Sequence, residues 1–340
     1  MTMTIPHRFQ GLGVSRGGLV VSLGALIAVA CGGPTGREPA ETDDETAVHQ
    51  AAVRSRCTES TLRAAVRDDG RFDFATCDNP DGIVQVSATI PIQVSRFVLE
   101  GRGALRLVWS GGGTCDKTVG QPALFDIRGD DNVLRGFSVE GAPDGIHVST
   151  GRRNRLEGLT YPFVCEDAIT NGNKTAASAT ETLIKNCVFK KSDDKAIQSN
   201  GGSLRVEGCR FENVKRAIGA CAEIADPGHH PVRPCPIASH ITAVGNTVIG
   251  CSGYAFRSAG KRSRGAQGTL SAIGNTFVDC SGAIAAYEDG ESYAEGNKHT
   301  GRCAATLKSV DRGELRYCRQ TSVCDKLVDG SSSRVRASCR

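Results

Sequence analysis

Four short strings in the middle of the sequence share one pattern, in which a charged residue precedes a small residue and an isoleucine. Successive copies lie 21 to 28 residues apart, which is the length of one coil of a solenoid. If the coils stack, the charged residues form a column on one face, with neighbours about 4.8 Å apart. Along the chain the column runs acid, acid, base, base: Asp144, Asp167, Lys195 and Arg216.

From Arg71 onward the sequence consists of short runs of β-branched and aromatic residues, each followed by Gly, Asn or Asp. The copies at 204–211, 241–248 and 270–277 each contain a strand, a Gly or Asn corner and a second short strand. The four strings supply a third strand. Three short strands per coil predict an all-β fold, a right-handed parallel β-helix in which each coil buries its apolar face against the next. A β-sandwich would not repeat matching corners at a near-constant period.

The first residues are expected to form a targeting segment. Arg8 and Arg16 precede an apolar run over 19–30 that is too short to span a bilayer. Residues 1–30 are therefore predicted to be a lipoprotein-type signal peptide, with the lipid on Cys31. Ordinary cleavage near Ala30, which would leave Cys31 free, is the alternative. The acidic segment 31–56 is predicted to be a disordered tether. The protein is expected to be exported, as an outer-membrane lipoprotein or a secreted protein, and to contact a membrane only through this lipid.

The sequence contains 15 Cys, so lipidation of Cys31 would leave an even number to pair in an oxidising compartment. Cys187 and Cys209 each stand two residues before a Phe of the repeat, which predicts neighbouring positions on adjacent coils and a disulfide. Cys251 and Cys280 align in another column and are also predicted to pair. In both cases stacked thiols without a bond are the alternative. The β-helix is expected over 57–302, and the Cys-rich segment 303–340 is expected to cap it.

Carboxylates on adjacent coils favour a cation site, because hard oxygen ligands on a rigid surface suit Ca²⁺. A surface salt-bridge ladder is the alternative. The net charge of +4 is too small to indicate a nucleic-acid partner, but it is compatible with an acidic polymer. His147 is interpreted as a turn or sheet-edge residue rather than a catalytic base, and the pair His229–His230 as inert residues of a Pro-rich loop rather than a metal site. The candidate metal ligands are Asp144, Glu166, Asp167 and Asp194, and the candidate cations facing an anionic substrate are Lys195, Lys215 and Arg216.

A family resemblance favours the cation site over the salt-bridge ladder. From Cys115 to about Cys221 the sequence resembles the small, calcium-dependent pectate lyases of polysaccharide lyase family three. The specific pieces are Cys165-Glu166-Asp167-Ala168 and Asp193-Asp194-Lys195 followed by Asn200-Gly201, in this order and one coil apart. The resemblance implies a pectin-lyase-like β-helix that holds Ca²⁺ through the equivalents of Asp144, Glu166 and Asp167, close to Lys195.

Catalysis in that family uses a lysine and an arginine from the next coil, spaced as Gly-Lys-x-x-Arg. The corresponding stretch departs from this string and reads Asn213-Val214-Lys215-Arg216-Ala217-Ile218-Gly219. Either Lys215 is the lysine or Arg216 occupies its column, and the expected arginine falls at Ile218 or Gly219. A shift of one residue along a strand turns a side chain to the other face. The catalytic candidates are therefore Arg216, Lys215 and Lys195.

The resemblance implies β-elimination on polygalacturonate or pectin by a monomeric enzyme. In this reaction Ca²⁺ neutralises the uronate carboxylate, a cationic residue removes the C5 proton and the C4–oxygen bond breaks. Arginine acts as a base only where its charged form is disfavoured, so an alkaline optimum is expected. Two alternatives stay open. The altered Lys215-Arg216 string favours a lipid-anchored β-helix that binds acidic polysaccharide without cleaving it. Asp144, Asp167 and Asp194 could instead serve a β-helical pectin hydrolase as general acid and base.

Overall fold

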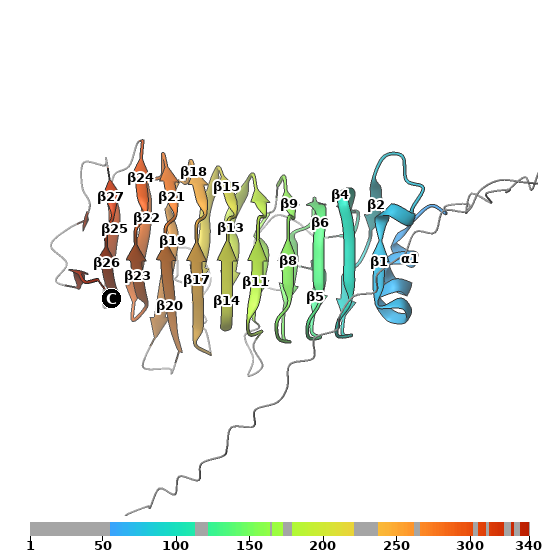
Figure 1. Cartoon of the computed structure of the whole chain (residues 1–340), viewed down its shortest axis with the longest axis horizontal. Coiled ribbons are helices and arrows are strands. Elements are labelled where there is room, and N and C mark those ends of the chain that lie inside the picture. The colour runs from blue at the N-terminus through green and yellow to red at the C-terminus, as the bar shows by residue number, and fades with distance from the viewer. Residues whose placement is uncertain are drawn as a thin grey trace, which may run out of the picture. The chain divides into compact units, whose positions relative to one another are not determined.

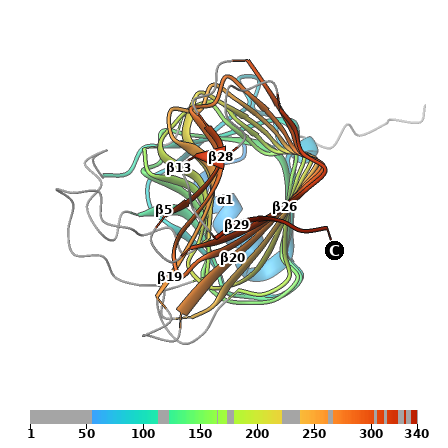
Figure 2. The same cartoon turned by 90° about the vertical axis from the view of Figure 1, so that its left-hand side faces the viewer.

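The computed structural model describes residues 55–112, 122–163, 165–172, 179–220, 237–261, 266–301, 305–310, 313–322, 328–329 and 334–339. In this part of the chain the strands follow one another coil by coil along a single stack (Figure 1). Viewed along the stack, the strands form three walls around a common interior (Figure 2). The parallel β-helix predicted from the repeated strings is confirmed, because each strand pairs with its counterpart in the neighbouring coil.

Wall one, as we call it, carries the four aligned strings. Its parallel strands pair in chain order, and adjacent coils contribute one strand each. The strands of wall one are β3 (Ile90–Ile92), β5 (Ala123–Ile127), β7 (Asp144–Val148), β10 (Asp167–Asn171), β13 (Ser192–Ser199), β16 (Val214–Ala220), β19 (Tyr254–Lys261), β22 (Gly282–Glu288), β25 (Ala305–Val310) and β28 (Val328–Asp329).

Walls two and three form the rest of each coil, and the long strands β4 (Val98–Trp109) and β6 (Val133–Glu140) run through both. Wall two contains β1 (Arg71–Asp73), β8 (Arg155–Glu157), β11 (Thr182–Lys185), β14 (Gly202–Glu207), β17 (Ser239–Val244), β20 (Ala266–Ile273), β23 (Glu291–Glu295), β26 (Glu314–Cys318) and β29 (Val335–Ala337). Wall three contains β2 (Ile83–Val86), β9 (Thr160–Tyr161), β12 (Val188–Phe189), β15 (Arg210–Glu212), β18 (Thr247–Ile249), β21 (Thr276–Val278), β24 (Lys298–Thr300) and β27 (Thr321–Ser322).

The interior is filled by columns of like side chains, one from each coil. On wall three the rings of Tyr161, Phe189 and Phe211 stack face to face, with centroids 5.1 and 4.8 Å apart. Further along, Phe277 stacks on His299 at 5.1 Å. A strand of two or three residues buries too little apolar surface to be stable alone, so these columns supply the stability that holds the coils in register.

A short helical segment covers the first coil, which the sequence pattern did not predict. It comprises α1 (Glu59–Ala64), a π-helical turn η1 (Ala65–Asp69) and, after β1, a 3-10 turn η2 (Phe74–Thr76). The Thr58 hydroxyl accepts from the Thr61 N–H, and the Thr61 hydroxyl accepts from the Thr58 N–H. This reciprocal cap satisfies two amides at the helix start. Leu62 is fully buried, so the segment closes the apolar end of the stack.

The Gly or Asn corners between walls two and three are confirmed. At this corner Asn186, Gly208, Gly245 and Gly274 all have φ between 53° and 61°, a left-handed conformation that Gly and Asn adopt most readily. Directly after the corner runs a ladder of buried amides. Asn246 and Asn275 each accept the backbone N–H of the previous coil, and Asn297 accepts the N–H of Asn275.

The disulfide predicted between Cys251 and Cys280 is confirmed, but the one between Cys187 and Cys209 is wrong. These two cysteines are stacked on adjacent coils as predicted, yet both are free, buried thiols. On their coils they occupy the position, directly after the corner, that Asn246 and Asn275 occupy on later coils. The Cys187 N–H donates to the Cys209 sulfur at 3.4 Å, and the Cys187 thiol lies 3.4 Å from the Lys185 carbonyl oxygen. Each sulfur is therefore directed at backbone groups along the ladder.

Further disulfides join Cys57 to Cys77 and Cys318 to Cys339, and Cys165 is also disulfide-bonded. Disulfides form in oxidising compartments, which indicates an exported protein. Within the predicted cap, strands β25 to β29 stack on the preceding coils. In the described residues no helix is long and apolar enough to cross a membrane. The signal peptide, lipid site Cys31, most of the tether, Cys115 and His229–His230 lie outside the described residues.

Candidate functional site

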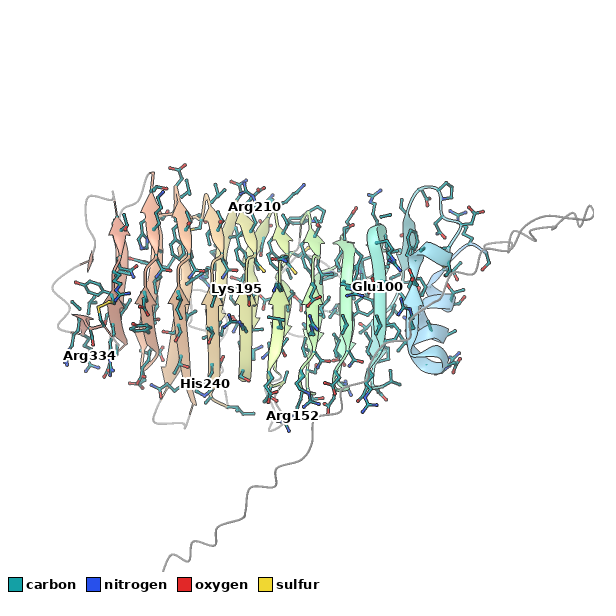
Figure 3. All side chains as sticks on the ribbon, viewed as in Figure 1. Glu100, Arg152, Lys195, Arg210, His240 and Arg334 are labelled. Atoms are coloured by element: carbon teal, nitrogen blue, oxygen red, sulfur yellow. A yellow bond between two sulfur atoms is a disulfide. The ribbon has the colours of Figure 1, made fainter. Side chains whose placement is uncertain are left out.

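The charged column of Asp144, Asp167, Lys195 and Arg216 is assembled by four consecutive strands of wall one. Asp167 pairs in register with Lys195, and Lys195 with Arg216. The pairing of Ile146 with Ile169 sets Asp144 beside Asp167. The predicted stacking of these four residues is therefore confirmed. Lys195 lies near the middle of the stack (Figure 3).

Each three-residue string has a physical reason. The isoleucines are fully buried, and the small residue before each one is buried too. A Cβ on Gly145 would collide with the Ala168 carbonyl oxygen and would lie 2.7 Å from the Tyr161 ring. Only a very small residue fits at this tight inward position. The chain before it turns outward, so the preceding charged side chain faces the outer surface of wall one.

Cations and carboxylates alternate along the lower half of the column. The Lys195 ammonium lies 3.5 Å from Asp167 Oδ1 and forms an ion pair with Asp194. Arg216 Nη1 lies 3.5 Å from Asp194 Oδ1. The side chains of Lys195 and Arg216 are only 8% and 12% exposed. Burial lowers the pKa of Lys195, but Asp167 and Asp194 outweigh this and raise it overall, so Lys195 is a fixed positive charge.

The upper half of the column is crowded with carboxylates. Asp144 Oδ1 accepts the Asp167 N–H at 3.1 Å, and Glu166 is the next residue along the chain. Burial, reinforced by the charges of Asp144 and Asp167, raises the pKa of Glu166 to about 7. Burial also raises the pKa of Asp167 to about 7, even though Lys195 opposes the shift. Burial and neighbouring negative charges therefore outweigh the one nearby cation, Lys195, at these two carboxyls.

A second column follows the buried isoleucines by one residue and was not predicted. It contains His147, Thr170, Gln198 and Gly219 on successive coils, and Thr170 and Gln198 are themselves buried. His147 Nε2 lies 3.1 Å from Asp144 Oδ2. Burial lowers the pKa of His147, but Asp144 and Asp167 outweigh it and raise the pKa overall. The Thr170 hydroxyl lies 3.5 Å from Asp167 Oδ2. The available signal was the alternation of the strand, since a residue following a buried Ile faces outward.

The predicted metal ligands fit a hard cation in part. Asp144, Glu166 and Asp167 supply carboxylate oxygens, and Asp167 Oδ1, which is buried without a hydrogen bond and lies 3.5 Å from the Lys195 ammonium, could also ligate a cation. Asp194 fits less well because it is already paired with Lys195 and Arg216. Among the described residues no three His, Cys, Asp or Glu side chains converge as a finished coordination shell. A bound cation would therefore share its sphere with water or substrate oxygens, as Ca²⁺ accepts.

The structure places Arg216, rather than Lys215, in the register of the column. The two positions where the resemblance implies a further arginine cannot supply a base: Ile218 is fully buried in the core, and Gly219 has no side chain. The next cation in the second column is Arg257, in register with Gly219 one coil further on.

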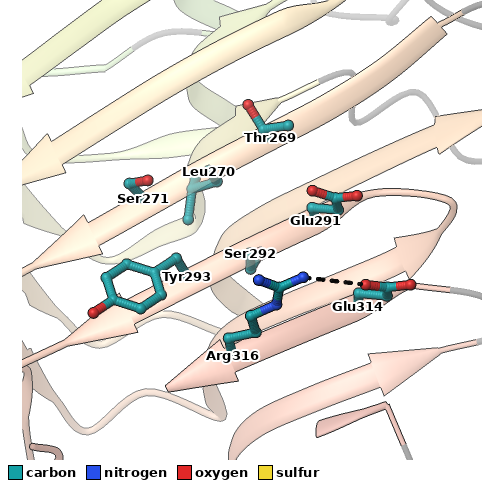
Figure 4. A pocket seen from close by; sticks show the side chains of 8 residues that line it. All are labelled: Thr269, Leu270, Ser271, Glu291, Ser292, Tyr293, Glu314 and Arg316. Carbon is teal, nitrogen blue, oxygen red and sulfur yellow. Dashed lines mark ion pairs between the residues drawn. The ribbon is translucent and has the colours of Figure 1, made fainter. Parts of the chain in front are cut away.

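A pocket of about 220 Å³ lies away from the charged column, on wall two of the last coils (Figure 4). Glu291, Glu314 and Arg316 surround it, with Glu314 and Arg316 forming an ion pair at 4.0 Å. Tyr293 also lines it, and its hydroxyl donates to Glu295 at 3.0 Å. No residue of this pocket belongs to the predicted site.

Comparison with known proteins gives solved structures that this chain resembles and one matching family model. The solved alginate lyase from Paenibacillus sp. str. FPU-7 has a TM-score of 0.52 at 12% identity, over 84% of this chain and 99% of that one. The A-module of the mannuronan C-5 epimerase AlgE6 from Azotobacter vinelandii has a TM-score of 0.49 at 11% identity, over 75% of this chain and 79% of that one. No relative was found among curated protein sequences. The family model described as "Right handed beta helix region" matches residues 124–299, which is just over half of the sequence. The chain therefore belongs to the right-handed β-helix family.

Proposed function

We propose that this protein is an exported pectate lyase that cleaves polygalacturonate by calcium-assisted β-elimination on wall one. The observation that carries the proposal is the column itself, in which two carboxylates and two cations occupy adjacent coils. Strands about 4.8 Å apart present one charged side chain per step, so a polyanionic chain lying across them meets a cation site and then two basic side chains. The alginate lyase of similar fold is itself a polysaccharide lyase, which is consistent with this chemistry.

Asp144, Glu166 and Asp167 would hold the calcium ion. Burial raises the pKa values of Glu166 and Asp167 to about 7, so a bound cation would stabilise their ionised forms, and Asp167 Oδ1, which accepts no hydrogen bond, would face the ion together with Lys195. The chemistry that calcium supplies when bound is neutralisation of the uronate carboxylate, which makes the neighbouring C5 proton more acidic.

The basic half of the column binds the substrate and moves its proton. Lys195, held by Asp167 and Asp194, pairs with a uronate carboxylate. Arg216, oriented by Asp194, would accept the C5 proton in its neutral form, which it reaches by first giving up a proton to water. The electron pair of the C5–H bond becomes the C4=C5 double bond, and the C4–oxygen bond breaks. The leaving oxygen keeps its electron pair and takes a proton from water.

A continuous absorbance assay for the unsaturated product tests this proposal. Wild-type protein with polygalacturonate and calcium should give product, and EDTA should abolish it. Arg216→Ala should lower the rate by about 10²–10⁴-fold, the usual value of a positioned proton acceptor. Arg210→Ala, which removes an exposed arginine on wall three, should leave the rate unchanged. An Arg216→Ala enzyme with full activity would overturn the assignment of the base.

A non-catalytic binder is the second candidate, and one contact favours it. The ion pair between Arg216 and Asp194 stabilises the charged guanidinium, which binds anions but accepts no proton. Retention of the polymer without unsaturated product would support the binder. Reducing ends without the absorbance would instead indicate a hydrolase.

A further inference from the structure

Wall one does not become neutral after Arg216, although the resemblance to a known family ends near Cys221. The two columns continue into β19, β22 and β25 with aromatic and cationic residues, of which Arg257 is buried. Ile218 pairs with Phe256, which sets Tyr254 after Arg216 in the charged column. Arg257 and Lys308 continue the second column, separated by Ala285.

These residues contact one another across coils. The Arg257 guanidinium lies 4.2 Å from the centre of the Tyr287 ring, and the Lys308 ammonium lies 5.9 Å from that of Tyr254. The Tyr254 and Tyr287 rings meet edge to face at 6.4 Å. We call this set of four residues the downstream platform. Cation–aromatic contacts of this kind fix the direction of a cationic head group at little entropic cost.

Glycine positions shape both ends of this surface. Tyr254 leans over Gly282, since a Cβ on Gly282 would collide with the tyrosine ring. The ring therefore lies along the stack towards the following coils. At Gly219, in register between Gln198 and Arg257, the second column carries no side chain. At Gly219, between the charged column and the downstream platform, the second column therefore presents only backbone atoms.

We propose that the downstream platform is an additional binding site for the uronate polymer, occupied by the sugars next to those held at the charged column. The inference rests on the proposed function for the identity of the polymer. Aromatic rings present an apolar face to sugar C–H groups, and the Lys308 ammonium complements uronate carboxylates. The buried Arg257 holds the Tyr287 ring through its cation–aromatic contact. Counting Lys195 and Arg216, four cations lie on five consecutive coils of one wall. A 1,4-linked pyranose advances by a distance similar to the strand spacing, so each coil faces about one sugar.

Oligogalacturonates of different length test whether the downstream platform binds the polymer. Dimeric and hexameric oligogalacturonates are titrated by calorimetry with EDTA present, so that cleavage does not interfere. The hexamer reaches from the charged column to the platform and the dimer does not. Tyr254→Ala and Lys308→Ala should each weaken hexamer binding about five- to twentyfold, a typical value for a partly desolvated cation–aromatic contact. Dimer binding should stay unchanged, and Tyr254→Phe should keep most of the affinity.

Controls separate the platform from general electrostatics and from misfolding. Arg210→Ala removes the same charge from wall three and should not alter hexamer binding. A neutral 1,4-linked hexasaccharide should bind neither wild type nor variants. Thermal unfolding checks that Tyr254→Ala and Lys308→Ala remain folded. Equal losses for dimer and hexamer, or no loss for the hexamer, would overturn the proposal.

The outcome also distinguishes the platform from the lyase. If the variants weaken hexamer binding while wild-type protein forms no unsaturated product, the platform stands and the lyase proposal fails. If product forms and hexamer affinity does not depend on Tyr254 or Lys308, the lyase stands and the platform fails.

Discussion

At the scale of single residues, the three residues of each string on wall one have three different structural roles. In Asp167-Ala168-Ile169 the carboxylate faces outward, the alanine fits a tight inward corner and the isoleucine fills the core. Because the core residue fixes the register, the charged residue cannot move relative to its neighbours. Charges that would avoid each other on a flexible loop are therefore kept close together.

The closely spaced carboxylates of Glu166 and Asp167 should make folding stability depend on pH. The folded-state pKa values of Glu166 and Asp167 are raised to about 7 from ordinary values of 4.5 and 3.8. A raised carboxyl pKa contributes stability that is complete below its unfolded pKa and is lost as pH rises through the folded pKa. In EDTA the melting temperature should therefore fall between about pH 4 and pH 8.

Differential scanning calorimetry with matched variants measures this effect. Glu166→Gln should flatten the pH dependence by a few degrees, at about 2–4 °C per kcal/mol for a domain of this size. Glu212→Gln, on wall three, should not. Added calcium should restore stability at pH 8 and should do little at pH 4, where protons occupy the same oxygens. A melting temperature that rises from pH 4 to pH 8 in EDTA equally in wild type and Glu166→Gln would contradict the prediction.

At the scale of secondary-structure elements, the amide ladder ties consecutive coils together at the corner between walls two and three. Asn275 Oδ1 accepts both the backbone N–H and the side-chain amide of Asn246, and its own amide donates to the Ala243 carbonyl. Cys209 occupies the same column but offers its neighbour only a weak sulfur acceptor. Strong amide hydrogen bonds and a weak sulfur contact thus occupy equivalent positions on successive coils.

Two alanine substitutions compare these rungs. Asn275→Ala strands several buried polar groups and should cost about 2–4 kcal/mol of unfolding free energy, at about 1–3 for each. Cys209→Ala removes only a sulfur contact and a small apolar volume, so it should cost clearly less. Chemical denaturation followed by circular dichroism measures both. Equal losses would show that packing, rather than hydrogen bonding, sets the stability of the ladder.

The elements also show what the sequence could predict and what it could not. The strings at Asp144, Asp167, Lys195 and Arg216 repeat often enough to predict stacking and register, because repetition reports the geometry shared by all coils. Helix α1 occurs once, is six residues long and buries only Leu62, so it leaves no periodic signal. The second column was missed because His147, Thr170 and Gln198 share a position but no chemistry. For Cys187 and Cys209 the column was correct, but side-chain direction, which the sequence does not specify, decides bonding.

At the scale of the whole molecule, a solenoid has only nearest-neighbour contacts, so its ends are its weakest parts. The first and last described coils carry disulfides between residues about twenty positions apart, Cys57–Cys77 and Cys318–Cys339. Loops of this length are worth about 3 kcal/mol each in the chain-entropy account. The disulfides are therefore placed where unfolding would otherwise begin.

Reduction should consequently loosen the ends before the centre. After treatment with a phosphine reductant, hydrogen exchange followed by mass spectrometry should show lost protection in β1 and β29 well before β13. The unreduced protein serves as the control. The inner coils also contain the Cys251–Cys280 disulfide and the disulfide-bonded Cys165, but they are packed against a coil on either side, so they should lose less protection than the ends. Uniform loss of protection along the chain would contradict nearest-neighbour stability.

The in-register strands of wall one also give the protein a length scale. Each coil adds one strand spacing, so the distance from the charged column to the downstream platform is a whole number of steps, set between Arg216 and Lys308 by the strands β19, β22 and β25. Inserting one additional coil between β16 and β19 would move the platform by one step without changing a residue of either site. The shortest oligomer able to reach both sites would then lengthen by about one sugar. The number of coils between the two sites thus sets the length of the shortest polymer that can contact both.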